Sequence, residues 1–282
     1  MESVILVSLI FSRRHMKKII NITHSDVDGA VCAILMKEFC RQKGFTCEVH
    51  KAKYDMLDSL VYETHKEADK DTIIFITDCC PKTVPEGAEN IILIDHHVNA
   101  TKSNIKKKFV DAQEGVSASK MVYEYLGRLG VNFNEKYTKL VNLAHDYDTY
   151  TLSTILSSSL NYLYYFYYFE RFVDRFKNGF DGFTEDEKTF LYCKNRQIKE
   201  FLTNLEYRAI IEEVAFTVVE DHINEVAKYL YDNKGFQYVF LYTPKRKTLS
   251  MRSRRDANIH IGEFLELLGG GGHKNTGGVM AD

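Results

Sequence analysis

Short apolar runs alternate with amphipathic stretches in the first third of the chain. The apolar runs cover residues 19–23, 73–77 and 91–94 and are rich in isoleucine. Apolar runs of this length are typical of strands that are buried on both faces of a sheet. Between them, residues 30–40 and about 56–68 carry apolar side chains at helical spacing. Alternating strands and helices predict an α/β domain with a parallel sheet and helices on both faces.

Helical patterns continue beyond this region. Residues 117–129 and 135–148 are predicted helices, the first with Ser117 as a possible N-cap and Gly130 as its stop. Residues 184–206 form one long polar-faced helix, in which Thr184 and Glu187 fit a capping box. This helix is expected to connect two domains.

A smaller α+β unit is predicted after about residue 210. Its expected strands are residues 211–219, 236–243 and 247–252, and its expected helices are residues 222–232 and 258–268. A glycine run directly follows the last helix.

These patterns give four predicted segments. They are an N-terminal extension at 1–15, the α/β domain at 16–182, the connecting helix at 183–208 and the α+β domain at 209–282. Met16 precedes the first clean strand pattern, so either Met16 is the natural start or residues 1–15 form a loose extension.

Composition narrows the possible partners. The 282 residues include 37 Lys and Arg against 39 Asp and Glu, a net charge of −2, so no global positive field attracts long nucleic acids. An apolar run at residues 4–11 is too short to span a bilayer, and its basic residues follow it rather than precede it. We expect no membrane association, whereas an oligomer remains open.

The cysteines indicate a reducing compartment. None of the six forms a Cys-x-x-Cys pair, which disfavours a zinc site, and four belong to or follow apolar or helical stretches. A cytoplasmic location is the simplest interpretation. The adjacent Cys79 and Cys80 are expected to pack in the core rather than to act in redox control.

Carboxylates and histidines follow the three predicted strands directly. Grouped at one edge of a parallel sheet, such carboxylates would repel one another unless cations neutralised them. Oxygen donors mixed with imidazole favour two divalent ions, Mn²⁺ first, with one carboxylate bridging them. Each element alone is weak, and their joint placement carries the prediction. The set is His24, Asp26, Asp28, Asp78, Asp95, His96, His97 and either Asp146 or Asp148.

This set resembles the motifs of the DHH superfamily of phosphoesterases, in the expected order over residues 16–282. The first motif matches residues 24–29, the second Asp78, the third Asp95-His96-His97, and the fourth Asp146 or Asp148. The C-terminal region resembles the DHH-associated domain in the strand around Arg252, in Gly270-Gly271-Gly272-His273 and in Gly277-Gly278.

The resemblance implies a role for each matching residue. Asp78 would bridge the two metals, Asp95 would orient a neighbouring histidine, and His97 would face the scissile phosphate. Asp146 is favoured for the fourth motif because Tyr150 follows it by four positions, and Asp148 stays open. The further ligands would be His24, Asp26, Asp28 and His96.

The C-terminal motif residues would bind substrate. Arg252 carries a planar guanidinium suited to phosphate, and strand alternation would give Arg254 the same face. The backbone of Gly270, Gly271 and Gly272 could donate to phosphate oxygens, and His273 would add a donor.

The predicted enzyme is therefore a phosphoric ester hydrolase acting on small nucleotides or short single-stranded oligonucleotides. The alternatives are a single-strand exonuclease, a cyclic dinucleotide phosphodiesterase, a family II pyrophosphatase and an inactive nucleotide-binding module. For the aromatic residues at 162–172, packing is a stronger interpretation than base stacking.

Overall fold

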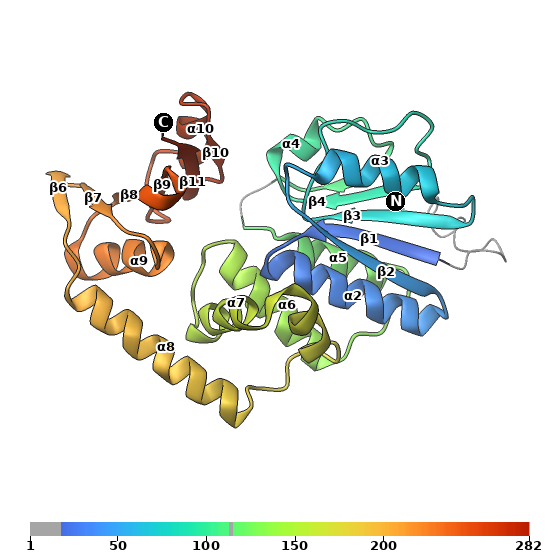
Figure 1. The fold of residues 1–282 in the computed structure, drawn as a ribbon, viewed down its shortest axis with the longest axis horizontal. Helices are drawn as coiled ribbons and strands as arrows, with labels where there is room; N and C mark the ends of the chain where they lie inside the picture. Colours follow the sequence, from blue (N-terminus) through green and yellow to red (C-terminus); the bar gives the residue numbers. More distant parts are fainter. Residues whose placement is uncertain (1–17, 113–114, 282) are drawn as a thin grey trace. The chain divides into compact units, whose positions relative to one another are not determined.

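A computed structural model describes residues 18–112 and 115–281. Within them, the chain forms two compact units, one ending at Phe183 and the other beginning at Thr184. The predicted N-terminal extension at 1–15 lies outside the described residues. Figure 1 shows the elements of each unit.

The first unit contains a five-stranded sheet in the order β2-β1-β3-β4-β5, and every neighbouring pair is parallel. β3 and β4 are buried along their whole length, as their apolar runs predict. The edge strands β2 and β5 are only partly buried, so their sequences lack such a run. The strands are β1 (Lys18–His24), β2 (Thr46–Ala52), β3 (Thr72–Thr77), β4 (Ile91–Asp95) and β5 (Lys107–Val110).

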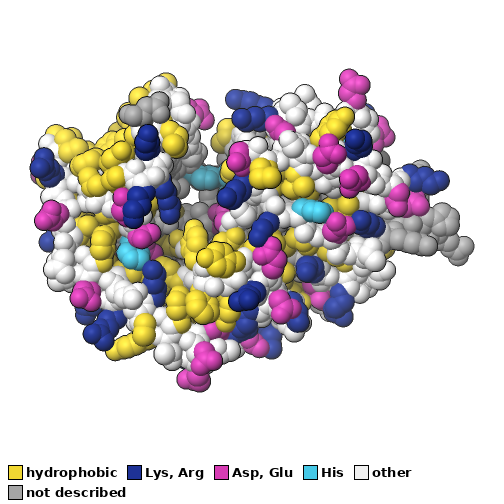
Figure 2. Space-filling view, viewed as in Figure 1, with side chains coloured by type: hydrophobic (Ala, Val, Ile, Leu, Met, Phe, Trp, Pro, Cys, Tyr) yellow, Lys and Arg dark blue, Asp and Glu magenta, His cyan; other side chains and the backbone are white. Residues whose placement is uncertain are grey.

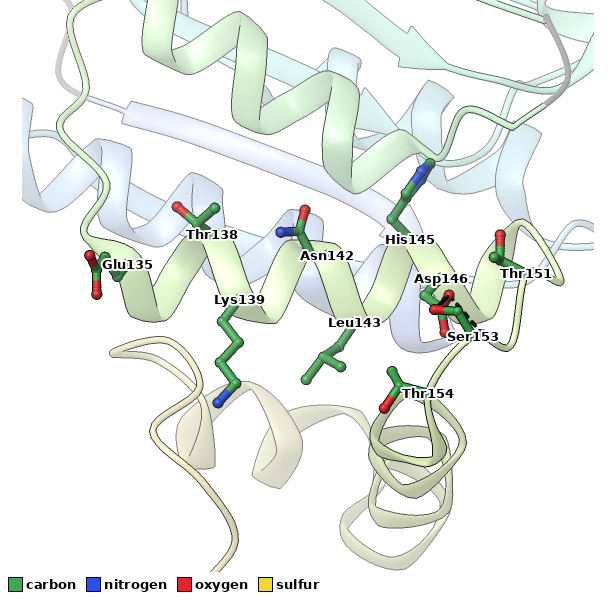
Figure 3. Close-up of a pocket in the computed structure, with 10 residues that line it drawn as sticks. All are labelled: Glu135, Thr138, Lys139, Asn142, Leu143, His145, Asp146, Thr151, Ser153 and Thr154. Carbon is green, nitrogen blue, oxygen red and sulfur yellow. Dashed lines mark hydrogen bonds between the residues drawn. The ribbon is translucent and has the colours of Figure 1, made fainter.

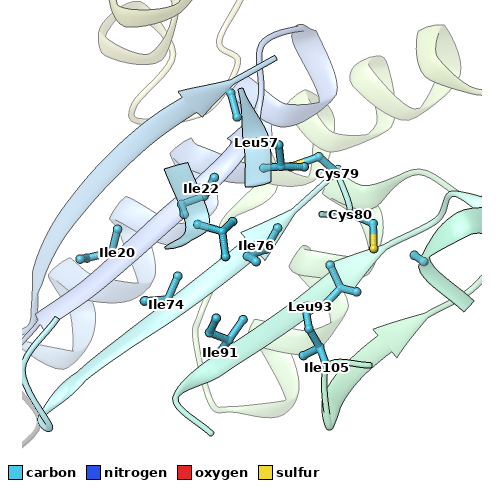
Figure 4. Close-up of a cluster of buried hydrophobic side chains, with 13 residues drawn as sticks. Ile20, Ile22, Leu57, Ile74, Ile76, Cys79, Cys80, Ile91, Leu93 and Ile105 are labelled. Carbon is cyan, nitrogen blue, oxygen red and sulfur yellow. The ribbon is translucent and has the colours of Figure 1, made fainter. Parts of the chain in front are cut away.

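Helices cover both faces of this sheet. On one face, Ile20, Ile74 and Ile76 pack against Leu57 and other residues of α3, as Figure 4 shows. On the other face, α2 packs against α5, α6 and α7. The predicted α/β architecture is confirmed. The helices are α2 (Val27–Lys43), α3 (Leu57–Glu67), α4 (Val98–Thr101), α5 (Ala118–Arg128), α6 (Glu135–Asp148) and α7 (Ile155–Arg175).

The aromatic segment lies within α7 and divides into buried and exposed side chains. Tyr162, Tyr164, Phe169 and Phe172 are buried. Their neighbours Tyr165, Phe166 and Tyr168 are largely exposed, and Tyr168 breaks the helical geometry with φ of 58°. Packing therefore explains part of the aromatic pattern.

The second unit contains a mixed sheet with helices, as predicted for the α+β fold, and it also includes the helix that was predicted to connect the two domains. It contains a six-stranded sheet in the order β10-β11-β9-β8-β7-β6, parallel between β7 and β8 and otherwise antiparallel. The long helix α8 (Glu185–Thr203) has the predicted capping box, formed by Thr184 and Glu187. The other elements are β6 (Arg208–Ile211), β7 (Val214–Val218), α9 (Ile223–Lys234), β8 (Tyr238–Thr243), η1 (Pro244–Arg246), β9 (Thr248–Ser253), α10 (Ile261–Glu266), β10 (Gly271–Gly272) and β11 (Thr276–Met280).

Two details of this unit differ from the sequence prediction. The strand expected at 211–219 is β7, and a further strand that was not predicted, β6, precedes it and folds back onto it through a turn at Glu212 and Glu213. The glycine-rich end also forms a hairpin, β10 and β11, which pairs with β9.

Across the described ranges, none of the helices has the length and hydropathy needed to cross a bilayer.

Candidate metal centre

The predicted metal ligands lie at the carboxyl edge of the parallel sheet. His24 ends β1, Asp95 ends β4, and Asp78 directly follows β3. Neighbouring parallel strands deliver their ends to the same edge, which brings these three side chains together. Asp78 is held there by a hydrogen bond of 3.1 Å from its N–H to the carbonyl of Ile94, in a left-handed conformation with φ of 59°. A non-glycine residue in this conformation is strained, a feature often found at functional sites.

The N-terminus of α2 adds two further carboxylates. Asp26 is the N-cap, and its Oδ1 accepts a hydrogen bond of 2.9 Å from the N–H of Gly29, while its Oδ2 lies 2.8 Å from His24 Nδ1. Asp28 is buried in the first turn, where its Oδ2 accepts from the N–H of Ser119 at 3.1 Å. Any side chain at Gly29 would collide with the end of β1, since a Cβ there would lie 2.1 Å from the carbonyl oxygen of His24.

Two groups of possible ligand atoms meet at Asp78. The first is His24, Asp26 and Asp78, whose ligand atoms all lie within 4.8 Å of one another. The second, Asp28, His96 and Asp148, meets the same limit. Asp78 faces both groups, because its Oδ1 lies 3.4 Å from His96 Nε2 and its Oδ2 lies 4.0 Å from His24 Nδ1. The predicted bridging carboxylate therefore lies between two candidate cation positions.

At the end of α6, the structure favours Asp148 over Asp146 for the cluster. Asp148 Oδ2 lies 3.7 Å from His96 Nε2. Positions two apart on a helix differ by about 200° around its axis, so Asp146 faces away. We therefore propose Asp148 as the fourth-motif ligand, in place of Asp146, which the spacing to Tyr150 favoured.

Asp146 instead lines a pocket of about 630 Å³ on α6 and the loop that follows, shown in Figure 3. Its Oδ1 accepts hydrogen bonds from the N–H of Ser153 at 3.0 Å and from the Ser153 hydroxyl at 2.5 Å. Although burial opposes it, this hydrogen bonding lowers the pKa of Asp146. Asp146 thus fixes the turn that leads into α7.

Electrostatics at the cluster favour bound cations. Burial, together with the neighbouring carboxylates, raises the pKa of Asp78 and of Asp148 well above the ordinary value. Burial likewise raises the pKa of Asp28 to about 6. Each of these three carboxylates has one buried oxygen without a hydrogen-bond partner in the described part of the chain. Divalent cations would satisfy these oxygens and offset the repulsion, so the residues fit the predicted metals.

Asp95 organises the two histidines that follow it. It is fully buried, and its Oδ1 accepts from the backbone N–H groups of His96 at 2.9 Å and His97 at 3.4 Å. The same oxygen lies 2.8 Å from His97 Nδ1. A carboxylate at Nδ1 favours the tautomer with a proton on that nitrogen, which leaves Nε2 for another partner.

In the second unit, the guanidinium of Arg252 is fixed by hydrogen bonds to other residues of the same unit. Its Nε donates to Asn224 Oδ1 at 3.0 Å, and its Nη1 donates to the carbonyls of Met251 at 3.0 Å and Gly277 at 3.1 Å. The expectation that strand alternation gives Arg254 the same face as Arg252 does not apply, because β9 ends at Ser253. Arg254 instead pairs with Asp256 at 3.1 Å.

The glycine motif has a structural role in the same unit. A Cβ at Gly270 would lie 2.4 Å from the carbonyl oxygen of Gly278, and one at Gly272 would lie 2.2 Å from that of Thr276. The backbone of the β10–β11 hairpin is therefore sufficient reason for glycine at these two positions. The N–H of His273 closes this hairpin by donating to Thr276 at 2.7 Å, and the predicted phosphate contacts of Gly270, Gly271, Gly272 and His273 stay predictions.

Comparison with known proteins now identifies the family. The family described as "DHH family, N-terminal domain" matches residues 18–155, which contain every proposed ligand in the first unit. Residues 18–155 of this chain therefore form a DHH-family N-terminal domain. A comparison with curated protein sequences gives no match.

Solved structures with the DHH fold resemble this chain at low identity. RecJ from Thermus thermophilus, in complex with Mn²⁺, has a TM-score of 0.64 and 15% identity, covering 100% of this chain and 52% of RecJ. An exopolyphosphatase-related protein from Bacteroides fragilis has a TM-score of 0.57 and 15% identity, covering 98% and 90%. The DHH domain of a protein assigned to a family of ribosomal proteins has a TM-score of 0.66 and 12% identity, covering 99% and 86%. These likenesses establish the fold, and this chain spans about half the length of that RecJ.

Two residues beside the DHH motifs were missed by the sequence analysis. Ser119, at the start of α5, supports Asp28 through its backbone N–H. Tyr54, beyond the end of β2, places its hydroxyl 3.3 Å from His97 Nε2. Neither belongs to a recognisable motif, and β2 lacks the apolar run that would have placed Tyr54 at the sheet edge.

Proposed function

We propose that this protein is a metal-dependent phosphoesterase that hydrolyses short oligonucleotides or small nucleotides. The main support is the position of Asp78. Its buried carboxylate faces both ligand groups, and one of its oxygens has no hydrogen-bond partner among the described residues. A carboxylate in this position is suited to bridge two cations.

The residues that would hold the ions follow from the two groups. His24, Asp26 and Asp78 would hold one, and Asp28, His96 and Asp148 would hold the other, with Asp78 shared. Two divalent ions would supply Lewis acidity and a water nucleophile of lowered pKa. Imidazole among the ligands favours Mn²⁺ over Mg²⁺, and the similar RecJ has been solved with Mn²⁺.

The protein's own groups would position the substrate. His97, whose Nδ1 is fixed by Asp95, lies partly exposed beside the cluster, and with both ring nitrogens protonated it would donate from Nε2 and stabilise negative charge developing on the scissile phosphate. Arg252 and His273, together with the glycine hairpin, would bind a terminal phosphate of the substrate. A guanidinium already fixed by Asn224 and Gly277 loses little side-chain freedom on binding.

The charge of the protein favours a small substrate over a long nucleic acid. The net charge is −2, and on the face drawn in Figure 2 acidic and basic side chains are interspersed rather than separated. Every phosphate beyond the site would need its own Lys or Arg to add affinity. We propose that kcat/KM is highest for substrates of about two to five nucleotides and falls for longer strands.

A similar structure described as the exonuclease RecJ keeps a single-strand exonuclease as an alternative, beside a cyclic dinucleotide phosphodiesterase. The set of carboxylates and histidines argues against an inactive nucleotide-binding module. The cytoplasmic location stays a prediction, consistent with six free cysteines of which four are buried.

The test is a substrate panel with purified protein and Mn²⁺. The panel contains a labelled length series of single-stranded oligonucleotides, with and without a terminal phosphate, together with a cyclic dinucleotide and pyrophosphate. The highest kcat/KM on the shortest oligonucleotides would support the proposal. Equal or faster processive digestion of long strands would favour the exonuclease, and preference for pyrophosphate would contradict both.

A further inference from the structure

Tyr54 lies near the carboxyl ends of the parallel strands, where the proposed metal ligands also lie. β2 pairs in parallel with β1, and Ala52 is the register partner of His24. Tyr54 is two residues beyond Ala52, so the chain leaving β2 carries it past the end of β1 and over the ligand cluster. The side chain is 48% exposed, which leaves part of it open to solvent or substrate.

The ring of Tyr54 contacts two histidines, His24, a proposed metal ligand, and His97, which is proposed to face the phosphate. Its centroid lies 4.8 Å from that of His24, with an interplanar angle of 38°. The same ring meets His97 edge-on, with centroids 6.2 Å apart and an angle of 84°. Its hydroxyl oxygen lies 3.3 Å from His97 Nε2.

These contacts hold the imidazole of His97 at both nitrogens. Asp95 Oδ1 lies 2.8 Å from Nδ1, and the Tyr54 hydroxyl lies within hydrogen-bond reach of Nε2. A ring fixed at one nitrogen can still rock about that contact, whereas a second contact on the opposite side restricts this motion. In a preorganised site, a residue that contacts the substrate keeps its orientation because a second residue packs against it or hydrogen-bonds to it.

We propose that Tyr54 is a positioning residue, which holds His97 in its orientation towards the scissile phosphate through the hydroxyl–Nε2 contact, with the Nε2–H of the doubly protonated ring shared between the hydroxyl oxygen and a phosphate oxygen. This inference rests on the proposed phosphoesterase function. The hydroxyl acts through His97, so its effect belongs to the chemical step rather than to substrate affinity. The exposed position of Tyr54 means that loss of the hydroxyl has little effect on folding stability, because water can replace an exposed partner.

The first experiment compares Tyr54→Phe with Tyr62→Phe. Tyr62 lies on α3 with 56% of its surface exposed and serves as a matched control. In Mn²⁺, Tyr54→Phe should lower kcat by about threefold to tenfold, the effect of one neutral hydrogen bond, and leave KM within about twofold. Tyr62→Phe should match the wild type. A Tyr54→Phe enzyme with unchanged kcat would overturn the proposal.

A double-mutant cycle shows whether the effect passes through His97. In the His97→Gln background, adding Tyr54→Phe should cause no further loss of kcat, because the group that Tyr54 positions is absent. The same loss in both backgrounds would overturn the positioning role and indicate a direct contact with substrate.

A spectroscopic measurement separates this inference from the proposed function. In metal-free protein labelled with ¹⁵N histidine, Tyr54→Phe should shift the His97 Nε2 resonance, and Tyr62→Phe should not. An unmoved resonance would refute the contact. If the wild type hydrolyses no phosphoester, the proposed function fails, and the resonance still decides whether Tyr54 holds His97.

Discussion

Substitution of the two aspartates at the end of α6 should have opposite consequences. Asp148 lies 3.7 Å from His96 in the candidate metal cluster, and burial raises its pKa well above the ordinary value. Asp146 faces away and accepts two hydrogen bonds from Ser153. Asp148→Asn and Asp146→Asn are isosteric and lie two residues apart, so each serves as the control for the other.

The expected magnitudes follow from metal linkage and hydrogen bonding. At a Mn²⁺ concentration of about 100 times Kd, the bound ion stabilises the wild type by about 2.7 kcal/mol. If Asp148→Asn weakens binding by about 100-fold, the same concentration adds only about 0.4 kcal/mol. Without metal, Asp148→Asn should be at least as stable as wild type, since it removes a repelled buried charge. Asp146→Asn should lose about 1 kcal/mol with or without metal, the difference between a charged and a neutral hydrogen bond.

Both variants can be measured by calorimetric titration with Mn²⁺ and by thermal unfolding in chelator and in Mn²⁺. The predicted pattern is a lost Mn²⁺ response in Asp148→Asn and a retained response from a lower baseline in Asp146→Asn. A lost metal response in Asp146→Asn, with a normal response in Asp148→Asn, would refute the assignment.

Three further predictions concern the rest of the chain. Gly29→Ala should lower both thermal stability and Mn²⁺ affinity, because its Cβ would lie 2.1 Å from the His24 carbonyl oxygen; an unchanged melting curve would contradict this. The hydrogen bond from Arg41 lowers the pKa of Glu38 from its ordinary value of 4.5. The free energy of unfolding should therefore decrease as the pH falls below that value and through the lowered pKa. Glu38→Gln should flatten this acid limb in denaturant titrations, and an identical limb would argue against the assignment. Arg252→Ala should weaken binding of substrates with a terminal phosphate by about 1.5–3 kcal/mol, with Mn²⁺ binding intact. Equal rates with and without that phosphate, in wild type and variant, would exclude this role.

The parts of the fold that could be predicted from sequence are those whose burial is complete. β3 and β4 are apolar along their whole length because both faces are covered, and the residues that follow them identify the sheet edge. The edge strand Thr46–Ala52 is only partly buried, so its sequence carries no comparable pattern. Tyr54 depends on the register of that strand and could not be placed without it.

The choice between Asp146 and Asp148 was also beyond sequence spacing. It depends on how α6 is rotated against the sheet, which is set by packing with α2, α5 and α7. The glycine motif illustrates a second limit. The glycines suggested backbone donors for phosphate, and the structure adds a reason that sequence could not supply: the hairpin itself leaves no room for side chains at Gly270 and Gly272.

If Asp78 bridges two divalent ions at the carboxyl ends of the strands, both ions should be visible by anomalous diffraction at the manganese absorption edge, from crystals soaked in Mn²⁺. We expect two anomalous peaks, one among His24, Asp26 and Asp78 and the other among Asp78, His96 and Asp148, with both lost in Asp78→Ala. Crystals with no peak at these residues, whether Mn²⁺ is bound elsewhere or not at all, would rule out the bridging role.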